Sequence, residues 1–211
     1  MKKAILLSGG MDSIALTYWY RQEISLAFTV NYGQKSAHKE IEVSKNVCAQ
    51  LNIMHEILEV DCNSLGSGEM SNGPVSNLSV APEWWPYRNQ LLITLVSMKA
   101  MTHNIRTLFF GAVKTDCKFK DGTYNFFKIL NMLLKMQEGA MEVLTPAIRL
   151  STFELIVKSK IPESLLLNAH SCHKGNDPCG ICNGCIKYID VIENLKNRNS
   201  TLVRICNPAP K

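Results

Sequence analysis

A short loop near the N-terminus, residues 8–13 with the sequence SGGMDS, constrains the fold of this chain more than any other feature. The loop follows an apolar run that is typical of a β-strand, and a segment with helical periodicity begins at its end. Its two glycines let the backbone turn sharply so that N–H groups converge, and the N-terminus of the following helix adds a partial positive charge. The loop therefore predicts an anion site, lined by the hydroxyls of Ser8 and Ser13, at the carboxyl end of a strand.

The loop carries a carboxylate, Asp12, and lacks the Gly-Lys-Ser/Thr ending of a Walker A loop. A carboxylate in a phosphate site repels the ligand unless a divalent cation lies between the two. Asp12 is therefore a candidate Mg²⁺ ligand, directly or through water. The alternative is an ordinary strand-to-helix turn, in which Asp12 lies in the first helical turn, where the helix dipole favours a negative charge.

Five β-rich runs alternate with helical segments along the chain. Strands are expected at residues 3–7, 25–30, 55–60, 107–111 and 142–144, and helices at residues 13–23, 36–51, 89–104, 124–138, 152–158 and 183–196. This alternation predicts an α/β fold with a parallel five-stranded sheet and helices on both faces, in which ligands bind at the carboxyl ends of the strands. Residues 62–86 are rich in Ser, Gly, Asn and Pro and have no clear period, so they are interpreted as a long loop, a lid or a mobile substrate-binding segment.

Composition and charge exclude several classes of protein. Hydrophobic residues make up 46% of the 211 residues, which is enough for a core and far from a disordered chain. No apolar run approaches the length of about 20 residues that a membrane-spanning helix needs. Because the N-terminal apolar stretch is short and runs into polar residues, no signal peptide is expected and the predicted location is the cytoplasm. A net charge of +5 without any long basic run suits a phosphate-bearing small molecule better than a nucleic acid.

Four of the eight cysteines lie within fourteen residues near the C-terminus: Cys172, Cys179, Cys182 and Cys185. In a reducing compartment this clustering indicates metal ligation rather than disulfides. Four thiolates fill a tetrahedral Zn²⁺ shell and leave no position for water, so a structural zinc knuckle is expected, with Lys174 and Lys187 offsetting its negative charge. The spacing also permits an iron–sulfur cluster, and unligated core cysteines are a third interpretation.

The SGGMDS loop resembles the pyrophosphate-loop signature of the ATP pyrophosphatases, which cleave ATP to AMP and pyrophosphate and so activate an oxygen by adenylation. Within that superfamily, the chain resembles the 7-cyano-7-deazaguanine synthase (QueC-like) family of the queuosine pathway. Residues 31–34, NYGQ, are similar to its Tyr-Gly-Gln, residues 85–89, WPYRN, are similar to its Pro-Gly-Arg-Asn, and the cysteine cluster occupies the matching place. The resemblance extends from Ile5 to about Tyr188.

The resemblance implies an adenine nucleotide alpha hydrolase-like fold, with an ATP-binding domain at residues 1–170 and a zinc-binding segment at residues 171–211. It implies an ATP-dependent ligase that adenylates the carboxylate of 7-carboxy-7-deazaguanine, forms the amide with ammonia and dehydrates the amide to 7-cyano-7-deazaguanine. ATP, Mg²⁺ and structural Zn²⁺ are the expected cofactors, and a homodimer is the expected assembly. The expected ATP-binding residues are Ser8, Gly9, Gly10, Met11, Asp12, Ser13, Tyr32 and Gln34.

Three further residues are candidates for the chemistry. Arg88 has a planar guanidinium suited to phosphate or carboxylate, although a surface ion pair would also explain it. Trp85 can stack on a purine-like ring, or pin the long loop to the body of the protein. Asp121 can accept hydrogen bonds from a guanine-like base, or belong to a turn with Gly122. The expected catalytic residues are Asp12, Arg88 and Lys114, and the expected substrate-binding residues are Arg88, Asp121 and Trp85.

The chain also departs from the family pattern. Tyr87 stands where a glycine is expected, and Thr152 stands where a lysine that neutralises phosphate charge is expected. The candidates to replace that charge are Lys114, Arg149 and Lys158. These departures leave room for a changed acceptor, as in a relative from antiphage defence that joins the deazaguanine to a protein N-terminus. A tRNA-modifying enzyme and a non-catalytic zinc scaffold are two further hypotheses.

Overall fold

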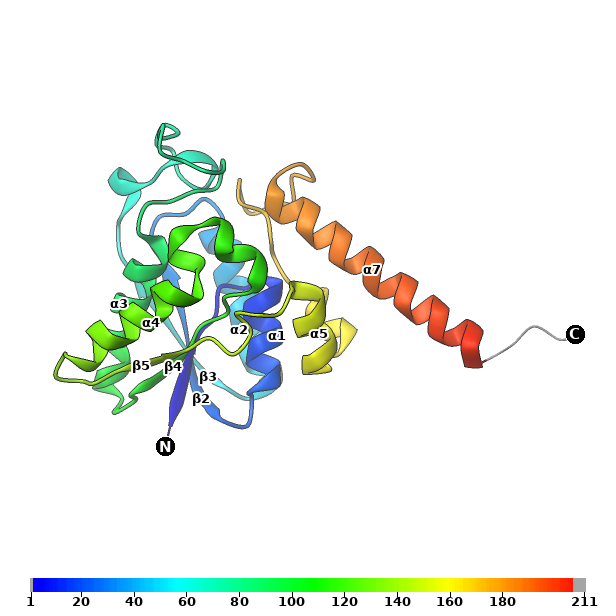
Figure 1. Cartoon of the computed structure of the whole chain (residues 1–211), viewed down its shortest axis with the longest axis horizontal. Coiled ribbons are helices and arrows are strands. Elements are labelled where there is room, and N and C mark those ends of the chain that lie inside the picture. The colour runs from blue at the N-terminus through cyan, green and yellow to red at the C-terminus, as the bar shows by residue number, and fades with distance from the viewer. Residues whose placement is uncertain (1, 207–211) are drawn as a thin grey trace, which may run out of the picture.

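The computed structural model describes the backbone of residues 2–206 and the side chains of residues 2–197. Its centre is a sheet of five parallel strands in the order β3-β2-β1-β4-β5 (Figure 1). The strands are β1 (Lys3–Leu6), β2 (Ile24–Asn31), β3 (Met54–Glu59), β4 (Thr107–Phe109) and β5 (Glu142–Leu144). The predicted parallel five-stranded sheet is confirmed, and each strand lies close to its expected position.

Alternating residues at the first strand explain why both faces of the sheet are covered. Ala4 and Leu6 pack into a first hydrophobic cluster on one face of the sheet, whereas Ile5 and Leu7 pack into a second cluster on the opposite face. Successive side chains of a strand point to opposite faces, so a strand that is apolar at every position needs a covering layer on each side.

Helices supply both layers (Figure 1). The first face carries α3 (Arg88–Thr102) and α4 (Tyr124–Lys135). The second face carries α1 (Met11–Trp19), α2 (Ala37–Leu51), α5 (Thr152–Ser159), α6 (Glu163–Leu166) and α7 (Asn183–Cys206). The first helix is shifted from its expected position at residues 13–23, because it begins directly after Gly10 and a turn at residues 20–23 leads into β2. The last helix continues beyond residue 196, its expected end, and extends away from the sheet.

The long loop between β3 and α3 contains two short 3-10 helices, η1 (Asn63–Leu65) and η2 (Gly68–Met70). Trp85, near its end, is buried in the first cluster together with Met70. Its ring packs edge-on against Tyr32, with the ring centroids 4.9 Å apart. The loop is therefore pinned to the body of the protein at Trp85.

None of the helices in the described part of the chain is both long and apolar enough to span a bilayer. The boundary near residue 170 stays a prediction, and residues 207–211 of the predicted C-terminal segment lie outside the described residues. The two predicted parts share a core, because Val191 of α7 is buried in the second cluster with Leu155 of α5.

Tyr87 precedes α3 with φ = 55°, in the left-handed region that glycine adopts without strain. The residue is 78% exposed, so its side chain contributes little packing. We therefore expect Tyr87→Gly to raise the free energy of unfolding by about 0.5–1 kcal/mol, as measured by urea denaturation. Tyr87→Ala is the control, because alanine keeps the strain. Equal stability of the glycine and alanine variants would contradict this account of the backbone.

Candidate nucleotide site and cysteine cluster

A cavity of about 250 Å³ opens at the carboxyl ends of β1, β2 and β4. Residues of loop 8–13 line it together with Tyr32, Arg88, Asp116 and Lys187, which come from four distant parts of the chain. In parallel α/β sheets, ligands bind at this edge, where the strand order reverses. Here the reversal occurs at β1, which lies between β2 and β4.

The backbone of loop 8–13 forms a fixed turn in front of α1. Gly9 has φ = 70°, and a Cβ atom at this position would lie 2.9 Å from the carbonyl oxygen of Glu40, so only glycine fits. The Ser13 hydroxyl donates to the Gly10 carbonyl oxygen at 2.9 Å and accepts from the Ser8 N–H at 3.2 Å. The two serine hydroxyls are themselves 3.2 Å apart. The loop therefore presents both serine hydroxyls and the N-terminus of α1 to the cavity.

A cluster of charges lies against this loop. Lys187 of α7 donates from Nζ to Oδ2 of Asp12 at 2.6 Å. The other oxygen of Asp12, Oδ1, is buried and has no hydrogen-bond partner in the described part of the chain. Asp116, in the 3-10 helix η3 (Lys114–Lys118), accepts at Oδ2 from the Val113 N–H at 2.9 Å.

The electrostatics of these three groups are coupled. Burial raises the pKa of the Asp116 carboxyl, and the negative charge of Asp12 raises it further. Burial alone lowers the pKa of Lys187, but the charges of Asp12 and Asp116 outweigh it, so this pKa is raised. Lys187 is therefore a cation that forms an ion pair with Asp12 and is further stabilised by the charge of Asp116. From the sequence, Lys187 is expected beside the cysteine cluster alone, and Asp116 is not among the predicted site residues.

A second set of polar side chains in the cavity wall consists of Arg88, Tyr32 and Glu40. Burial raises the pKa of Tyr32 far above its usual value, so its hydroxyl stays neutral, and burial also raises the pKa of Glu40. Gln34 orders both residues: its Nε2 donates to Oε2 of Glu40 at 2.9 Å, and its Oε1 accepts from the Tyr32 N–H at 2.9 Å. Arg88 thus joins Lys187 as a cation facing the cavity.

Most of the predicted ATP-binding residues line the cavity, namely Ser8, Gly10, Met11, Asp12, Ser13 and Tyr32. The remaining two, Gly9 and Gln34, stand behind its wall and shape it through the close approach and the hydrogen bonds described above. Nucleotide binding by these residues stays a prediction.

The predicted catalytic and substrate-binding residues are not all brought together. Arg88 lines the cavity, whereas Lys114 is exposed at the start of η3 and Trp85 lies behind Tyr32. Asp121 accepts at Oδ2 from the N–H of Asn89 at 3.1 Å, and so caps the first turn of α3. The roles assigned to Lys114, Trp85 and Asp121 stay predictions.

A second cavity of about 470 Å³ lies beside the first and shares Arg88, Asp116 and Lys187 with it. The start of α5 also lines this cavity, where the Ser151 hydroxyl caps the helix. Thr152, the next residue, is 3% exposed, and its hydroxyl has no partner among the described residues.

Buried Glu83 ties the long loop to the second cavity and to α7. It lines this cavity, accepts a hydrogen bond from Lys118, and accepts another from Nδ2 of Asn183 at 2.9 Å. Asn183 is the first residue of α7, so the end of the long loop and the start of this helix are held together.

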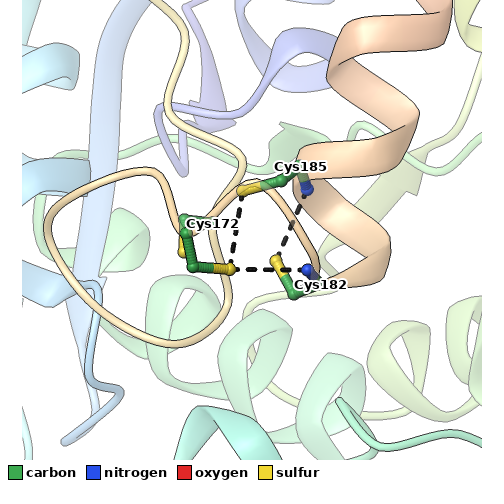
Figure 2. A group of neighbouring side chains, drawn as sticks. Cys172, Cys182 and Cys185 are labelled. Carbon is green, nitrogen blue, oxygen red and sulfur yellow. Dashed lines mark hydrogen bonds between the residues drawn. The ribbon is translucent and has the colours of Figure 1, made fainter.

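The Sγ atoms of the four clustered cysteines all lie within 4.8 Å of one another. A tetrahedral zinc site with Zn–S bonds of about 2.3 Å places its sulfurs about 3.8 Å apart, so this group can hold a zinc ion. The N–H groups of His173, Cys182 and Cys185 each lie 3.4 Å from a cysteine sulfur. Figure 2 shows Cys182 and Cys185 at the start of α7, facing Cys172 on the preceding loop. The chemistry of the donors thus fits the predicted zinc knuckle.

Close backbone packing and a lowered thiol pKa also favour metal binding by the four cysteines. A Cβ atom at Gly184 would lie 1.8 Å from the carbonyl oxygen of Ser171, so glycine lets α7 start directly against the Cys172 segment. Two backbone N–H groups lower the pKa of the Cys179 thiol to about 6, which favours the thiolate. Burial lowers the pKa of His173 to about 4, so its ring is neutral, and it lies outside the group of four sulfurs.

Comparison with known proteins finds relatives along nearly the whole chain. The family model described as "Queuosine biosynthesis protein QueC" matches residues 2–194. A 7-cyano-7-deazaguanine synthase of Methanosarcina barkeri is 24% identical, over 97% of this chain and 99% of its own. One of Chlorobium chlorochromatii is 28% identical and covers 92% of each chain. Among solved structures, an NMN synthetase from Francisella tularensis has a TM-score of 0.51 and 15% identity, over 92% of this chain and 76% of that one, and at this identity it shows the fold alone.

Proposed function

Because the chain belongs to the QueC family of queuosine biosynthesis proteins, we propose that it is an ATP-dependent synthase that converts 7-carboxy-7-deazaguanine into 7-cyano-7-deazaguanine. The family expected from the SGGMDS loop and the cysteine cluster is thereby confirmed. Relatives named 7-cyano-7-deazaguanine synthase match nearly the whole chain, and this supports the proposed product.

The observation that carries the proposal is the geometry around Asp12. Loop 8–13 offers two hydroxyls and the start of α1 to the cavity, which suits an anion. Beside them lies the buried, unpartnered oxygen Oδ1 of Asp12, which suits a divalent cation. An ATP molecule with Mg²⁺ fits both requirements, because loop 8–13 would hold the phosphates and Asp12 would hold the metal.

In the proposed reaction, a carboxylate oxygen of the substrate attacks the α-phosphorus of ATP, and pyrophosphate leaves. Ammonia then attacks the acyl carbon, and AMP departs with that oxygen to give the amide. A second ATP adenylates the amide oxygen, and loss of AMP and two protons gives the nitrile. The chain takes no covalent part in these steps, so it acts by orienting the reactants and stabilising charge.

Different residues of the first cavity would bind the phosphates, the metal and the substrate. Loop 8–13 would hold the β- and γ-phosphates, and Asp12 would hold Mg²⁺, which neutralises charge on the departing pyrophosphate. Arg88 would bind phosphate or the substrate carboxylate with its planar guanidinium. The neutral hydroxyl of Tyr32 would donate a hydrogen bond in the same space.

The cysteine cluster would serve the site through structure rather than chemistry, because four sulfurs close the zinc shell and leave no position for substrate. The segment that leads to Cys172 is bonded to loop 8–13, because the His170 N–H donates to the carbonyl oxygen of Gly9 at 2.9 Å. A zinc ion there would therefore fix one wall of the cavity.

Analysis of the products tests the proposal. The purified protein is incubated with ATP, Mg²⁺, 7-carboxy-7-deazaguanine and ammonia, and the products are measured by mass spectrometry. Many nitrile molecules per chain, together with AMP and pyrophosphate, are expected. Release of ADP and phosphate would contradict the mechanism, and accumulation of adenylate or amide without nitrile would point to a different acceptor. The homodimer stays a prediction that sedimentation of the same sample would test.

A further inference from the structure

We propose that Lys187 binds the phosphates of the nucleotide. It would supply the positive charge that is missing at position 152, where Thr152 replaces the expected lysine. The inference rests on the proposed function, because it takes a nucleotide to be the ligand of the first cavity. The replacements expected from the sequence are Lys114, Arg149 and Lys158, and none of these three lines either cavity. Lys187 lines both.

The position of Lys187 suits this role. Its Nζ already lies 2.6 Å from Asp12 in the loop, although the two residues are 175 positions apart in the chain. Its side chain is 35% exposed, so the ammonium is not sealed in the core. Thr152 lines the second cavity together with Lys187, so a long cationic side chain from either position would reach the same space.

The charge balance of the first cavity favours such a cation. Asp12, Asp116 and Glu40 line the wall, and Arg88 and Lys187 are its basic side chains in the described part of the chain, histidines aside. A triphosphate brings several more negative charges to this wall, and their repulsion is strong where water is excluded. Asp12 would hold a divalent cation, which would replace the ammonium as its countercharge and leave Lys187 free to bind the phosphates.

The cysteine cluster fixes the place from which Lys187 reaches the loop. Cys185 lies two residues before it, and Asn183 is tied to buried Glu83 by the 2.9 Å hydrogen bond. Because these contacts orient the first turns of α7, they also direct Lys187 toward Asp12. The cysteine cluster would thereby contribute to nucleotide binding through this one side chain.

Nucleotide affinity, measured by calorimetry with a non-hydrolysable ATP analogue and Mg²⁺, tests the inference without requiring turnover. Lys187→Ala is expected to weaken binding by about tenfold or more, because a charge-assisted contact to phosphate is lost. The matched control is Lys174→Ala, which removes a lysine beside the same cluster that pairs with Glu69 at 2.9 Å and lines neither cavity. Its affinity should equal that of the wild type. Adding Thr152→Lys to Lys187→Ala should restore much of the lost affinity.

The outcomes separate this inference from the proposed function. If Lys187 only fills the metal position at Asp12, then Lys187→Ala will bind the analogue with Mg²⁺ as tightly as the wild type or more tightly. That result would overturn the inference and leave the proposed function standing. A double variant that is folded by its thermal unfolding curve yet recovers no affinity would also contradict the inference. A folded wild-type protein that binds no nucleotide would overturn the proposed function, and the inference with it.

Discussion

Replacing Asp12 by asparagine is expected to slow AMP formation by about 100-fold or more, which corresponds to about 2.7 kcal/mol in the activation free energy. Asparagine keeps the shape of the side chain and a hydrogen-bond acceptor, but it removes the charge with which Asp12 would hold a divalent cation. The free energy of unfolding should change by only about 1 kcal/mol, because the ion pair with Lys187 is partly exposed and Asp116 remains as a countercharge. Initial rates and urea denaturation of the same preparation measure both quantities.

The control for this variant is Asp177→Asn, which makes the same chemical change at an exposed carboxylate outside both cavities. It should match the wild type in rate. A loss of no more than about tenfold for Asp12→Asn, equivalent to about 1.4 kcal/mol, would remove Asp12 from the catalytic residues.

The second large effect is expected at the cysteine cluster, where Cys182→Ser should remove the metal and much of the stability together. The Cys182 sulfur lies among the four grouped sulfurs and accepts the N–H groups of His173 and Cys185 at 3.4 Å. Because a closed thiolate site contributes its binding free energy directly to folding, a loss of about 3 kcal/mol or more is expected. Elemental analysis should give about one zinc per wild-type chain and far less in the variant.

Cys117→Ser is the matched control, because Cys117 is an exposed free cysteine outside the cluster. It should keep both zinc and stability. A strong chelator should destabilise the wild type to the level of Cys182→Ser and should leave that variant unchanged. Iron and sulfide in the purified protein, or a variant as stable as the wild type, would refute the zinc assignment.

The sheet could be predicted from the sequence because its signals are local. The apolar run before loop 8–13 is short, alternates between two clusters in the structure, and is typical of a strand covered on both faces. The loop itself indicates the edge of the sheet at which the cavity lies. The cysteine cluster could be predicted from an equally local signal, because Cys185 lies in the first turn of α7 and Cys182 directly precedes this helix.

The charge cluster could not be predicted in the same way, because it depends on how distant segments dock. Lys187 meets Asp12 only because α7 starts against the Cys172 segment, which in turn contacts Gly9. In the sequence, the closeness of Lys187 to Cys185 favours a role at the cysteine cluster. Asp116 carries one usable signal, its place shortly after the fourth strand, at the same edge of the sheet as the loop.

The measurement that tests the central claim most directly follows the oxygen atoms of the substrate. The protein is given 7-carboxy-7-deazaguanine labelled with ¹⁸O at both carboxylate oxygens, together with ATP, Mg²⁺ and ammonia, and the AMP is analysed by mass spectrometry. If the chain adenylates first the carboxylate and then the amide, each nitrile will be accompanied by two AMP molecules that each carry one ¹⁸O. Unlabelled AMP, or nucleotide released as ADP, would contradict the account, because neither substrate oxygen would then have been bonded to the α-phosphorus.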